Sequence, residues 1–409
     1  MKILIVENMF RGHYYLYLNY ILPRLADLVG TVDVAITSHG RNSPEFTTYL
    51  APLEKCAAFH PILASARPTD RLRLHLNMRE AARRFSPDYV LVPSGDAETS
   101  LMGLFRIAGR GGLPGTPSAE VGIHYGYGAR EARHKDKAKD LFYLVTQHLS
   151  SWRKIHFANL LFYERAKAWG GSLARRAELM PAPVPANPRL DKAESRRQLG
   201  IPEDGRYIGI AAILDKRKAI DTLLAAFRKA ALPSDRLLLA GRLDPSFARL
   251  IEHEYADLVR NDQLILFNRF VDPPTFQTIL SALDVATTPF PWHWNRSLTM
   301  LHAIAAGRPV LSSNVGWMRT MVDRFRFGWT CNVLDTTVFA AAIRQALDQC
   351  EDYRESEPVR KLLQFYSADN LVAHWLAGIR ETMALPPSEH ACSWPMVMKA
   401  LEDHGRAGV

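Results

Sequence analysis

The chain of 409 residues is poor in cysteine and has no pattern for a bound metal or a membrane span. Its four cysteines lie far apart without a C-x-x-C pair, which argues against a disulfide scaffold or a thiolate zinc site and fits a reducing compartment. There is no D-x-D and no cluster of His, Cys and Asp at ligand spacing, so we expect no metal. No apolar run reaches the ~18 residues that a membrane-spanning helix needs. The opening MKILIVENMF is too short for the apolar region of a signal peptide, so we expect a cytoplasmic protein.

The composition is that of a folded chain with an excess of positive charge. Apolar residues make up 47% and charged residues 23%, which argues against disorder, and no repeat or low-complexity segment occurs. At ~150 residues per domain, the length predicts two to three domains. A net charge of +9 favours anionic partners such as nucleotide phosphates or lipid headgroups. The basic residues are scattered along the chain, so we expect no nucleic-acid partner.

Short apolar runs alternate with amphipathic stretches over residues 1–183. Spacing and residue type predict helices over 14–28 and 70–84, and strands at 3–6, 32–38, 88–94 and 121–126. Continuous apolar strands between helices indicate a parallel sheet covered on both faces. We therefore predict a doubly wound, Rossmann-like α/β domain at 1–183.

A proline-rich segment separates this domain from a second one of the same kind. Four prolines fall within 180–190, and proline fixes φ and removes a donor, so this segment is predicted to be an extended linker. The alternation then restarts, with strands predicted at 206–214, 236–241, 264–271, 284–290 and 309–314, and helices over 221–231, 245–259, 274–283, 298–306 and 337–350. We predict a C-terminal domain at 184–368, followed by C-terminal helices at 369–409 that cross back to the N-terminal domain.

Three cations follow the first strand of the second domain. Ligands of parallel α/β sheets bind beyond the carboxyl ends of the strands, so loops at strand ends are the candidate sites. Lys216, Arg217 and Lys218 stand at such an end and precede a helix, where fixed charge and unpaired backbone N–H groups suit a diphosphate. Such groups can stabilise a departing diphosphate without a metal ion. The alternative is a solvated loop whose charges point outward.

Several motifs of the second domain are similar, in order and spacing, to those of GT-B glycosyltransferases of group 1, which are retaining nucleotide-sugar enzymes. RRQLGIPED (196–204) resembles their opening helix and turn, and LDKRKAIDTLLAAF (214–227) their phosphate-lysine stretch. The other similar motifs are RLLLAGRLD (236–244), LSALDVATTPF (280–290) and HAIAAGRPVLSSNVG (302–316). The resemblance runs from 196 to 322, and more weakly over the whole chain.

The resemblance implies two Rossmann-like domains facing across a cleft, with the nucleotide-sugar donor held mainly by the C-terminal one. It makes Lys218 the lysine that binds the donor phosphate, with Lys216 and Arg217 beside it. It also gives His302 the position that contacts the nucleotide ribose. The alternative for His302 is a packing residue of its helix.

The loop WHWNRS (292–297) leads from a predicted strand into a helix. Ser297 can cap that helix, or the same N–H groups can bind a phosphate. Arg296 is a candidate clamp for the diphosphate, and Trp294 and Asn295 are candidates for contact with the donor sugar or nucleotide. The alternative is a structural aromatic loop with an ordinary cap.

Two histidines are candidate catalytic residues of the N-terminal domain. Gly12 and His13 follow the first strand, and glycine lets the backbone pass close to a ligand. The resemblance implies that this turn approaches the transferred sugar, and that His124 lies near donor and acceptor. A histidine there can move a proton or bond to a sugar hydroxyl. The alternative for His124 is a buried histidine bonded to backbone.

The stretch 129–139 holds five Lys or Arg against two acids. The resemblance implies that such a basic face docks on an anionic membrane or recognises an anionic acceptor, with the enzyme peripheral on the inner membrane face. The alternative is a solvated face.

The chain also departs from the family pattern. The two donor-site glutamates would fall on Trp294 and His302, and an upstream arginine on Ala212 or Ile213. Two functions stay open. One is a metal-independent glycosyltransferase, without a cofactor beyond its nucleotide-sugar substrate, that acts with retention on a glycan, lipid-linked or small-molecule acceptor. The other is a catalytically silent GT-B subunit for binding or scaffolding. A sugar-nucleotide epimerase would need carboxylates around the sugar, and the sequence offers no convincing set.

Overall fold

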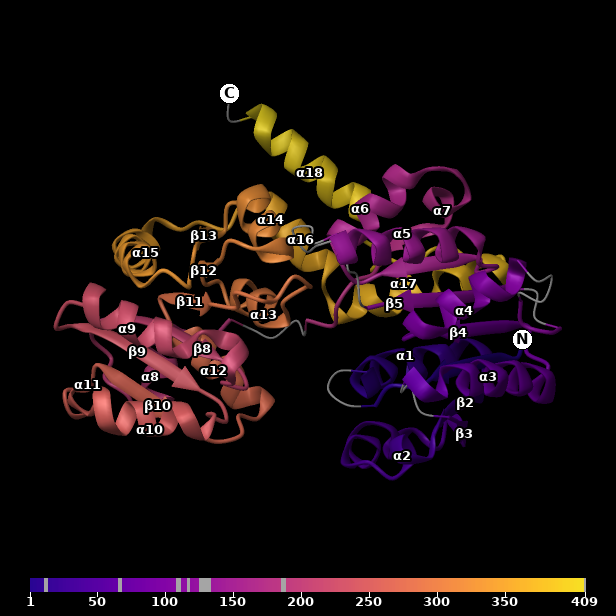
Figure 1. The fold of residues 1–409 in the computed structure, drawn as a ribbon, viewed down its shortest axis with the longest axis horizontal. Coiled ribbons are helices and arrows are strands. Elements are labelled where there is room, and N and C mark those ends of the chain that lie inside the picture. Colours follow the sequence, from indigo (N-terminus) through magenta and orange to yellow (C-terminus); the bar gives the residue numbers. More distant parts are fainter. Residues whose placement is uncertain are drawn as a thin grey trace. The chain divides into compact units, whose positions relative to one another are not determined.

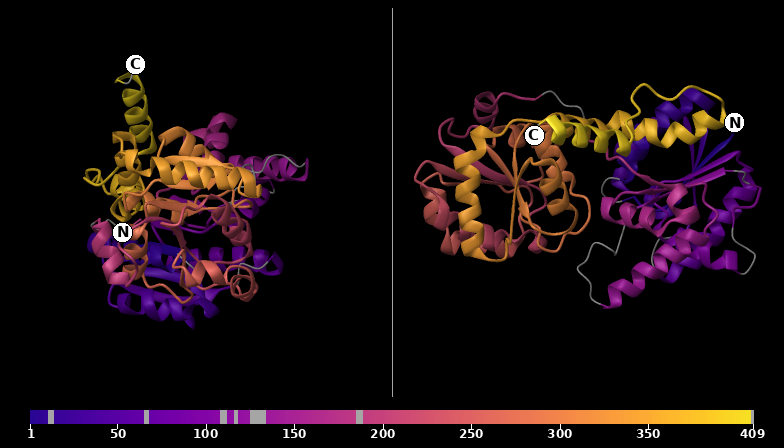
Figure 2. Two further views of the ribbon diagram at one scale, coloured as in Figure 1. Left: turned by 90° about the vertical axis from the view of Figure 1, so that its left-hand side faces the viewer. Right: turned by 90° about the horizontal axis from the view of Figure 1, so that it is seen from above.

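The computed structural model describes residues 1–10, 14–64, 68–107, 112–115, 118–124, 134–184 and 189–407. The chain forms two compact units (Figure 1). Unit 1 comprises Met1–Pro183 and Ser367–Cys392, and unit 2 comprises Val184–Tyr366 and Ser393–Val409. Each unit is built around one parallel sheet with helices on both of its faces (Figure 2).

The sheet of unit 1 has seven strands in the order β3-β2-β1-β4-β5-β6-β7, and every pair is parallel. Its strands are β1 (Ile3–Glu7), β2 (Val32–Thr37), β3 (Ala57–Leu63), β4 (Tyr89–Val92), β5 (Ser118–Ile123), β6 (Lys154–Phe157) and β7 (Ala177–Leu179). Its helices are α1 (Tyr14–Val29), α2 (Ser38–Arg41), η1 (Phe46–Leu50), η2 (Ala51–Leu53), η3 (Pro68–Asp70), α3 (Arg71–Phe85), α4 (Asp96–Ile107), α5 (His134–Leu149), α6 (Leu160–Trp169), α7 (Gly171–Arg176) and α17 (Ala368–Thr382).

The strand order of unit 1 reverses direction between β1 and β4. The chain runs from β1 outward to β3, then returns to β4 and runs outward on the other side. Right-handed crossovers in opposite directions place helices on opposite faces of the sheet. Accordingly α1 and α17 share one core cluster that includes the fully buried Leu18 and Trp375, while α3, α4 and α5 pack side by side. Figure 2, on the right, shows α17 in yellow beside α1 in indigo.

The sheet of unit 2 has six parallel strands in the order β10-β9-β8-β11-β12-β13. Its strands are β8 (Arg206–Ala211), β9 (Asp235–Ala240), β10 (Leu264–Phe267), β11 (Val285–Thr288), β12 (Val310–Ser313) and β13 (Gly328–Cys331). Its helices are α8 (Lys192–Leu199), η4 (Lys216–Lys218), α9 (Ile220–Ala230), α10 (Pro245–Glu254), α11 (Ala256–Arg260), α12 (Pro273–Ala282), α13 (Leu298–Ala305), α14 (Gly316–Phe325), α15 (Thr336–Gln349), η5 (Cys350–Asp352), α16 (Glu357–Phe365) and α18 (Trp394–Ala407).

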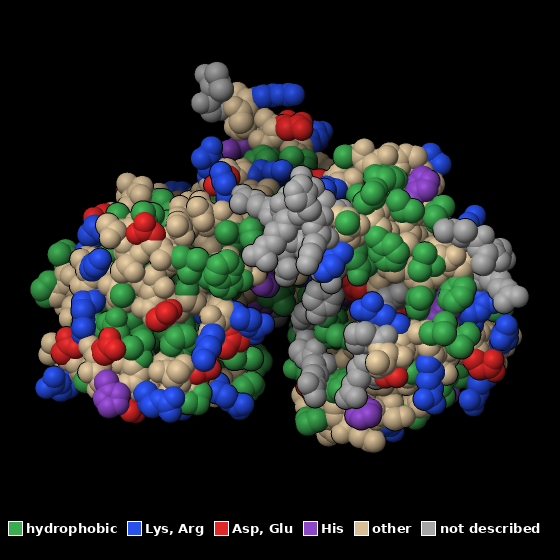
Figure 3. Space-filling view, viewed as in Figure 1, with side chains coloured by type: hydrophobic (Ala, Val, Ile, Leu, Met, Phe, Trp, Pro, Cys, Tyr) green, Lys and Arg blue, Asp and Glu red, His purple; other side chains and the backbone are tan. Residues whose placement is uncertain are grey.

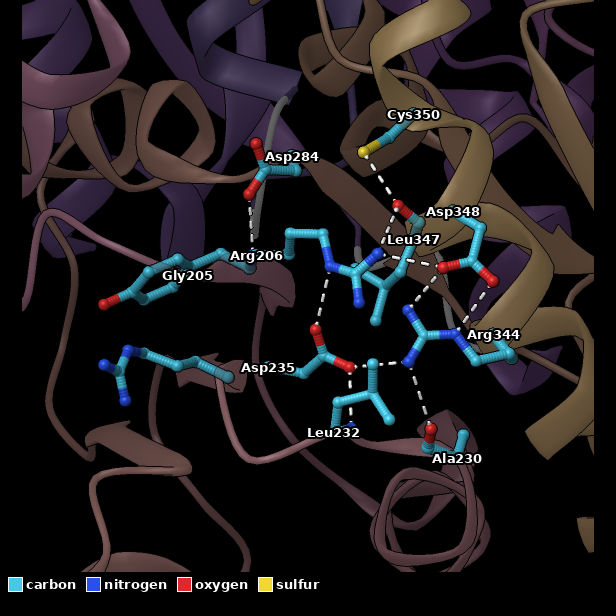
Figure 4. A network of polar contacts seen from close by, with 12 residues as sticks. Gly205, Arg206, Ala230, Leu232, Asp235, Asp284, Arg344, Leu347, Asp348 and Cys350 are labelled. Atoms are coloured by element: carbon cyan, nitrogen blue, oxygen red, sulfur yellow. Dashed lines mark hydrogen bonds and ion pairs between the residues drawn. The ribbon is translucent and has the colours of Figure 1, made fainter.

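An ion-pair network ties the amino ends of β8 and β9 to α15 (Figure 4). The carboxylate of Asp235 is fully buried and accepts from Arg206 at 3.0 Å and from Arg344 at 2.7 Å. Both guanidinium groups also pair with Asp348 on α15, each at 2.9 Å. This network stabilises the edge of the sheet opposite to the strand ends at which ligands bind.

The predicted fold class, two doubly wound parallel sheets, is confirmed. Four strands are absent from the sequence analysis. Three of them, β3, β7 and β13, lie at sheet edges, where half-exposed residues interrupt the apolar run, and the fourth, β6, is an inner strand of only four residues that begins with the half-buried Lys154. The terminal helices differ from the expectation that both cross back to the N-terminal domain. Helix α17 belongs to unit 1, whereas α18 groups with unit 2, where Trp394 packs on Phe365 of α16.

Candidate functional site

The carboxyl ends of all six strands of unit 2 lie along one edge of the sheet, because every pair is parallel. Helix η4 follows β8, and the loop 289–297 follows β11, which pairs with β8. Neighbouring strands therefore deliver the cations of 216–218 and the loop 292–297 to the same place. We take this edge as the candidate donor site.

Two glycines allow the close contacts on which this edge depends. Gly241, after β9, has φ +128°, and a Cβ there would lie 1.7 Å from the carbonyl oxygen of Ala212. Gly316 begins α14 with φ +50°, and a Cβ there would lie 2.9 Å from the Cα of Trp294. Because L side chains rarely adopt such φ values, both positions favour glycine. The loop 292–297 is thus seated directly on the start of α14.

Lys218 is the most enclosed of the three cations. Its Nζ lies 4.2 Å from the ring centroid of Phe290, and its neighbours Lys216 and Arg217 are exposed. Burial lowers the pKa of Lys218, and Arg217 lowers it further, while Asp215 raises it. A bound diphosphate would favour the charged ammonium and reverse this shift.

His293 connects Lys218 to the rest of the loop. Its ring lies 6.0 Å from that of Phe290, and its Nε2 donates to the backbone oxygen of Arg296 at 3.2 Å. Burial lowers the pKa of His293, the bond to Arg296 raises it, and the charges of Lys218 and Arg217 lower it again. Phe290 and His293 are therefore parts of the site that the sequence analysis passed over.

Arg217 and Arg296 have partners inside unit 2. The side chain of Arg217 is 74% exposed and pairs with Asp215, whose carboxylate also accepts from the Arg217 backbone N–H at 3.0 Å. For Arg217, this arrangement agrees with the alternative of a solvated loop whose charges point outward. Arg296 lies with its guanidinium carbon 5.9 Å from the ring centroid of Tyr366. The structure thus gathers Lys218 and His293 around Phe290, links His293 to the backbone of Arg296, and turns Lys216 and Arg217 toward solvent.

The remaining predicted donor residues have structural contacts of their own. The Ser297 hydroxyl accepts from the backbone N–H of Met300 at 3.3 Å and so caps α13. The backbone oxygen of Trp294 accepts from Trp317 at 3.2 Å, and Asn295 beside it is half-buried. His302 packs edge-on against Phe276 of α12 at 5.4 Å, and burial lowers its pKa to about 4. His302 is therefore a neutral imidazole at physiological pH, and its contact with a ribose stays a prediction.

Three large apolar side chains stand exposed at the same edge of unit 2. Ile213 follows β8, Phe270 follows β10 and Trp292 follows β11, and they are 67%, 76% and 65% exposed. They are the most exposed large hydrophobic side chains among the described residues. Exposed aromatics at strand ends suit the flat face of a base or sugar.

In unit 1, His124 directly follows β5. It is 8% exposed, its Nε2 donates to the backbone oxygen of Pro93 at 3.0 Å, and its ring packs on Tyr14 at 5.2 Å. This is the contact pattern of a buried histidine bonded to backbone, and its catalytic role stays a prediction. Gly12 and His13, as well as 129–133 of the basic stretch, lie outside the described residues.

Two buried glutamates lie at the carboxyl ends of the strands in the sheet of unit 1 (sheet 1), where β1 and β4 are neighbours. Glu7 ends β1 and accepts from the Ser94 hydroxyl at 2.9 Å and from the Met9 backbone at 2.8 Å. Asn8 donates to the backbone oxygen of Ser94 at 3.1 Å and to Glu98 of α4. Glu98 is 1% exposed, and its second oxygen is buried with no hydrogen-bond partner among the residues that the structure describes.

The pKa values of both carboxyl groups are raised. Burial raises the pKa of Glu7 to about 8 against the bonds from Met9 and Ser94, and burial raises that of Glu98 to about 8. The pair lies where the strand order reverses, which is the place where open α/β sheets bind ligands. Only strand adjacency brings these residues together, so the sequence alone could not have paired them.

The described residues hold neither a candidate metal centre nor a membrane-spanning helix. In that part of the chain, no three His, Cys, Asp or Glu side chains gather in a group that could hold a metal ion. Within the same residues, no helix has the length and apolar character required to cross a bilayer.

The two parallel sheets of seven and six strands give the chain a GT-B-like fold, which solved structures share. HepE from Anabaena, solved in complex with UDP, has a TM-score of 0.65 and 14% identity over 94% of this chain and 100% of that chain. The lipopolysaccharide outer core galactosyltransferase WaaB has a TM-score of 0.61 and 12% identity over 100% of both chains. At these identities the likeness shows the fold.

Residues 205–349 match the family model for glycosyl transferases group 1. This segment contains η4 and the loop 292–297, and the match confirms the resemblance to that enzyme class over unit 2. The O-antigen biosynthesis glycosyltransferase WclY of Escherichia coli is 28% identical over 169 residues, which is 39% of this chain and 44% of that protein. The chain thus matches less than half the length of this curated relative.

Proposed function

We propose that the chain is a glycosyltransferase that moves a sugar from a nucleotide-sugar donor to a hydroxyl-bearing acceptor. The observation that carries the proposal is the half-buried cation Lys218 at the carboxyl edge of sheet 2, inside the segment that matches the group 1 family. Its role is to stabilise the negative charge that builds on the departing phosphate. Because it is already partly desolvated by Phe290, its interaction with a phosphate is stronger than in open solvent.

The donor would lie along the edge from η4 to the loop 292–297. Lys218 and Arg296 hold the diphosphate, and the exposed rings of Phe270 and Trp292 are available to a base or sugar face. HepE, which has a similar fold, was solved with UDP, so UDP and its sugars are the first donors to test. With fixed cations at the phosphates, we expect transfer without a metal ion.

The acceptor would bind at the carboxyl edge of sheet 1. His124 and the Glu7–Glu98 pair lie there, and a protonated carboxyl can donate to a sugar hydroxyl while a carboxylate accepts from one. The relative WclY is named for O-antigen biosynthesis, which supports a glycan or lipid-linked acceptor and a place at the inner membrane face. Retention of configuration remains the expectation from the family.

The test is titration calorimetry of the purified chain with UDP and UDP-glucose, repeated with GDP-, ADP- and dTDP-sugars. The Lys218→Ala variant should bind the preferred donor about tenfold to a hundredfold more weakly, because a charge-assisted hydrogen bond contributes about 1.5–3 kcal/mol. Lys229→Ala is the matched control, since it removes the same charge from an exposed position at the other end of α9. Equal losses in both variants would contradict the phosphate assignment.

A second readout separates the enzyme from a silent binding subunit. Donor hydrolysis or transfer should be detected with the wild-type chain and the donor that binds. Tight donor binding without any turnover, across acceptors extracted from cell-surface glycolipids, would favour the silent subunit. If the chain bound no nucleotide sugar, the donor site would be rejected both for the active enzyme and for a silent subunit that binds the donor.

A further inference from the structure

Phe290 brings a lysine and a histidine to the same place in the candidate donor site. The Nζ atom of Lys218, on η4, lies 4.2 Å from the centroid of the Phe290 ring. The ring of His293 meets the Phe290 ring edge-on, with the centroids 6.0 Å apart and an angle of 89° between the planes. Because η4 follows β8 and Phe290 follows β11, two neighbouring strands deliver these basic side chains to one aromatic ring.

The ring of His293 is held at one nitrogen, and its other nitrogen is available. Nε2 lies 3.2 Å from the backbone oxygen of Arg296, and a carbonyl oxygen only accepts, so Nε2 carries a hydrogen. In the neutral ring Nδ1 is then the acceptor, and protonation of His293 takes place at Nδ1. Among the residues that the structure describes, the His293 side chain makes no other hydrogen bond. Nδ1 can therefore take up and give a proton while the bond to Arg296 keeps the ring in place.

Backbone hydrogen bonds on both sides of His293 fix its place in the loop. The His293 N–H donates to the backbone oxygen of Phe290 at 3.2 Å. The backbone oxygen of the next residue, Trp294, accepts from the N–H of Trp317 on α14 at 3.2 Å. A group that transfers a proton is effective only when its geometry is held in this way. The contacts of His293 therefore suit a reactive side chain.

The charges that act on His293 are cations, and they oppose its protonation in the free chain. Burial lowers the pKa of His293 most, the bond to Arg296 raises it, and Lys218 and Arg217 on η4 lower it. Asp215, which precedes η4, acts on Lys218 and pairs with Arg217. A bound diphosphate adds negative charge beside these groups and would raise the pKa of His293. Binding of the donor should therefore be coupled to the uptake of a proton at Nδ1.

The surface around the site carries charges of both signs. On the face of unit 2 that Figure 3 presents, Lys and Arg side chains are interspersed with Asp and Glu. On α14, which contacts the loop at Trp294, Arg319 and Asp323 pair with each other at 3.3 Å. His302 on α13 is neutral at physiological pH, because burial lowers its pKa to about 4. The positive charge at the phosphates must therefore come from the residues that line the site.

The departing diphosphate gains one negative charge when the bond between the sugar and its phosphate oxygen breaks. Lys218 and Arg296 are fixed charges, which attract the donor before that step as well as during it. A group that moves a proton to the departing oxygen acts only as the charge develops, and such differential stabilisation is what lowers the barrier. Histidine suits this task, because its ordinary pKa lies close to neutral.

We propose that His293 is a catalytic residue of the sugar transfer, and that its Nδ1 gives a proton to the phosphate oxygen that departs from the sugar. The bond between the anomeric carbon and this oxygen breaks, and a bond between the anomeric carbon and the acceptor oxygen forms. The acceptor hydroxyl releases its proton to solvent, and His293 takes up a proton from solvent, so protons and charge balance over the cycle. The inference rests on the proposed glycosyltransferase function and adds a residue to it.

The first test is proton uptake by the wild-type chain on donor binding. Titration calorimetry with UDP-glucose, or with whichever nucleotide sugar binds, is repeated near neutral pH in buffers that differ in ionisation enthalpy. The phosphates of a nucleotide sugar stay ionised throughout, so the uptake reports on the protein. We expect uptake in the wild-type chain and its loss in His293→Gln, which keeps a donor for the Arg296 oxygen but has no proton to exchange.

The outcomes of this test separate the inference from the function on which it rests. Donor binding that is weakened by Lys218→Ala but occurs without proton uptake would overturn the role of His293 and leave the donor site in place. Uptake that persists in His293→Gln would also overturn that role. If no nucleotide sugar bound, the donor site and the role of His293 would both be rejected.

The second test is the pH dependence of turnover. His293→Gln should lower kcat about a hundredfold or more, with a smaller change in KM, because the missing proton acts only in the chemical step. In the wild-type chain, kcat should fall as pH rises above the pKa of His293 in the donor complex, and the variant should lack that fall. A residue that only positions the loop would change kcat without changing the shape of this profile.

The matched control is His253→Gln, which replaces an exposed histidine on α10 of the same unit. It should keep the kcat and the pH profile of the wild-type chain, and equal melting temperatures would show that both variants fold. A His293→Gln variant that turned over at the wild-type rate, with the wild-type profile, would contradict the proposal.

Discussion

Glu7 and Glu98 are two carboxyl groups that the fold holds in a place unfavourable to their charge. Each is 1% exposed, and the pKa of each is raised to about 8, mainly by burial. They lie where β1 and β4 adjoin, although apolar residues there would pack without the free-energy cost of burying an ionisable group. Such placement is common at functional sites, and it has a consequence for stability that can be measured before any substrate is known.

Glu98 should make the stability of unit 1 depend on pH. Its pKa rises from 4.5 in the unfolded chain to about 8 in the folded one, so the folded state binds the proton more tightly. Its contribution to the free energy of unfolding is therefore fully present below pH 4.5 and is lost as pH rises toward 8, by about 1.4 kcal/mol per pH unit. In the Glu98→Gln variant, the melting temperature should therefore fall less steeply with rising pH across this range than it does in the wild-type chain, as thermal unfolding at several pH values would show.

The control for this measurement is Glu80→Gln, on the exposed surface of α3. It should leave the pH slope of the wild-type chain unchanged. A Glu98→Gln variant with the full wild-type slope would mean that Glu98 is ionised in the folded chain at neutral pH.

Strands and the loops between them differ in how much of their structure the sequence predicts. Central strands such as β1, β4 and β9 are buried along their whole length, so their apolar runs are visible in the sequence. The loops between them are a different case. Lys218 was found from its place after a strand, but Phe290 and His293 join it only because β11 pairs with β8. Pairing across the sheet, not local pattern, completes the candidate site.

The ion pairs at the amino edge of sheet 2 allow a direct test of burial. Asp235 on β9 and Asp348 on α15 contact the same two arginines, but Asp235 is fully buried and the side chain of Asp348 is 52% exposed. Asp235→Asn should destabilise unit 2 by about 3–5 kcal/mol, because it leaves partly buried guanidinium groups without their carboxylate. Asp348→Asn should cost about 1 kcal/mol or less. Urea unfolding followed by tryptophan fluorescence measures both, and equal effects would contradict the role of burial.

The order of the chain does not coincide with the order of its folded units. Sequence periodicity divides the chain at the proline-rich segment, but it cannot tell where the last helices pack, because any amphipathic helix can be covered by either unit. In the structure the chain leaves unit 2 after Tyr366, contributes α17 to unit 1, and returns after Cys392 as α18 of unit 2. Unit 1 is therefore completed by residues that come after most of unit 2 in the sequence, and unit 2 by residues that come after the last segment of unit 1.

Two tryptophans mark these terminal pieces and allow the division to be tested. Trp375 on α17 is fully buried against the sheet and α1 of unit 1, and Trp394 on α18 is 6% exposed and packs on Phe325 and Phe365 of unit 2. Each replacement by alanine removes a large buried side chain and should cost about 3–5 kcal/mol. Hydrogen exchange should show faster opening of β1, β2 and β4 in Trp375→Ala, and of α14 and α16 in Trp394→Ala. If either variant opened both units equally, the two pieces would not belong to separate cores, because substitutions in independent cores act separately.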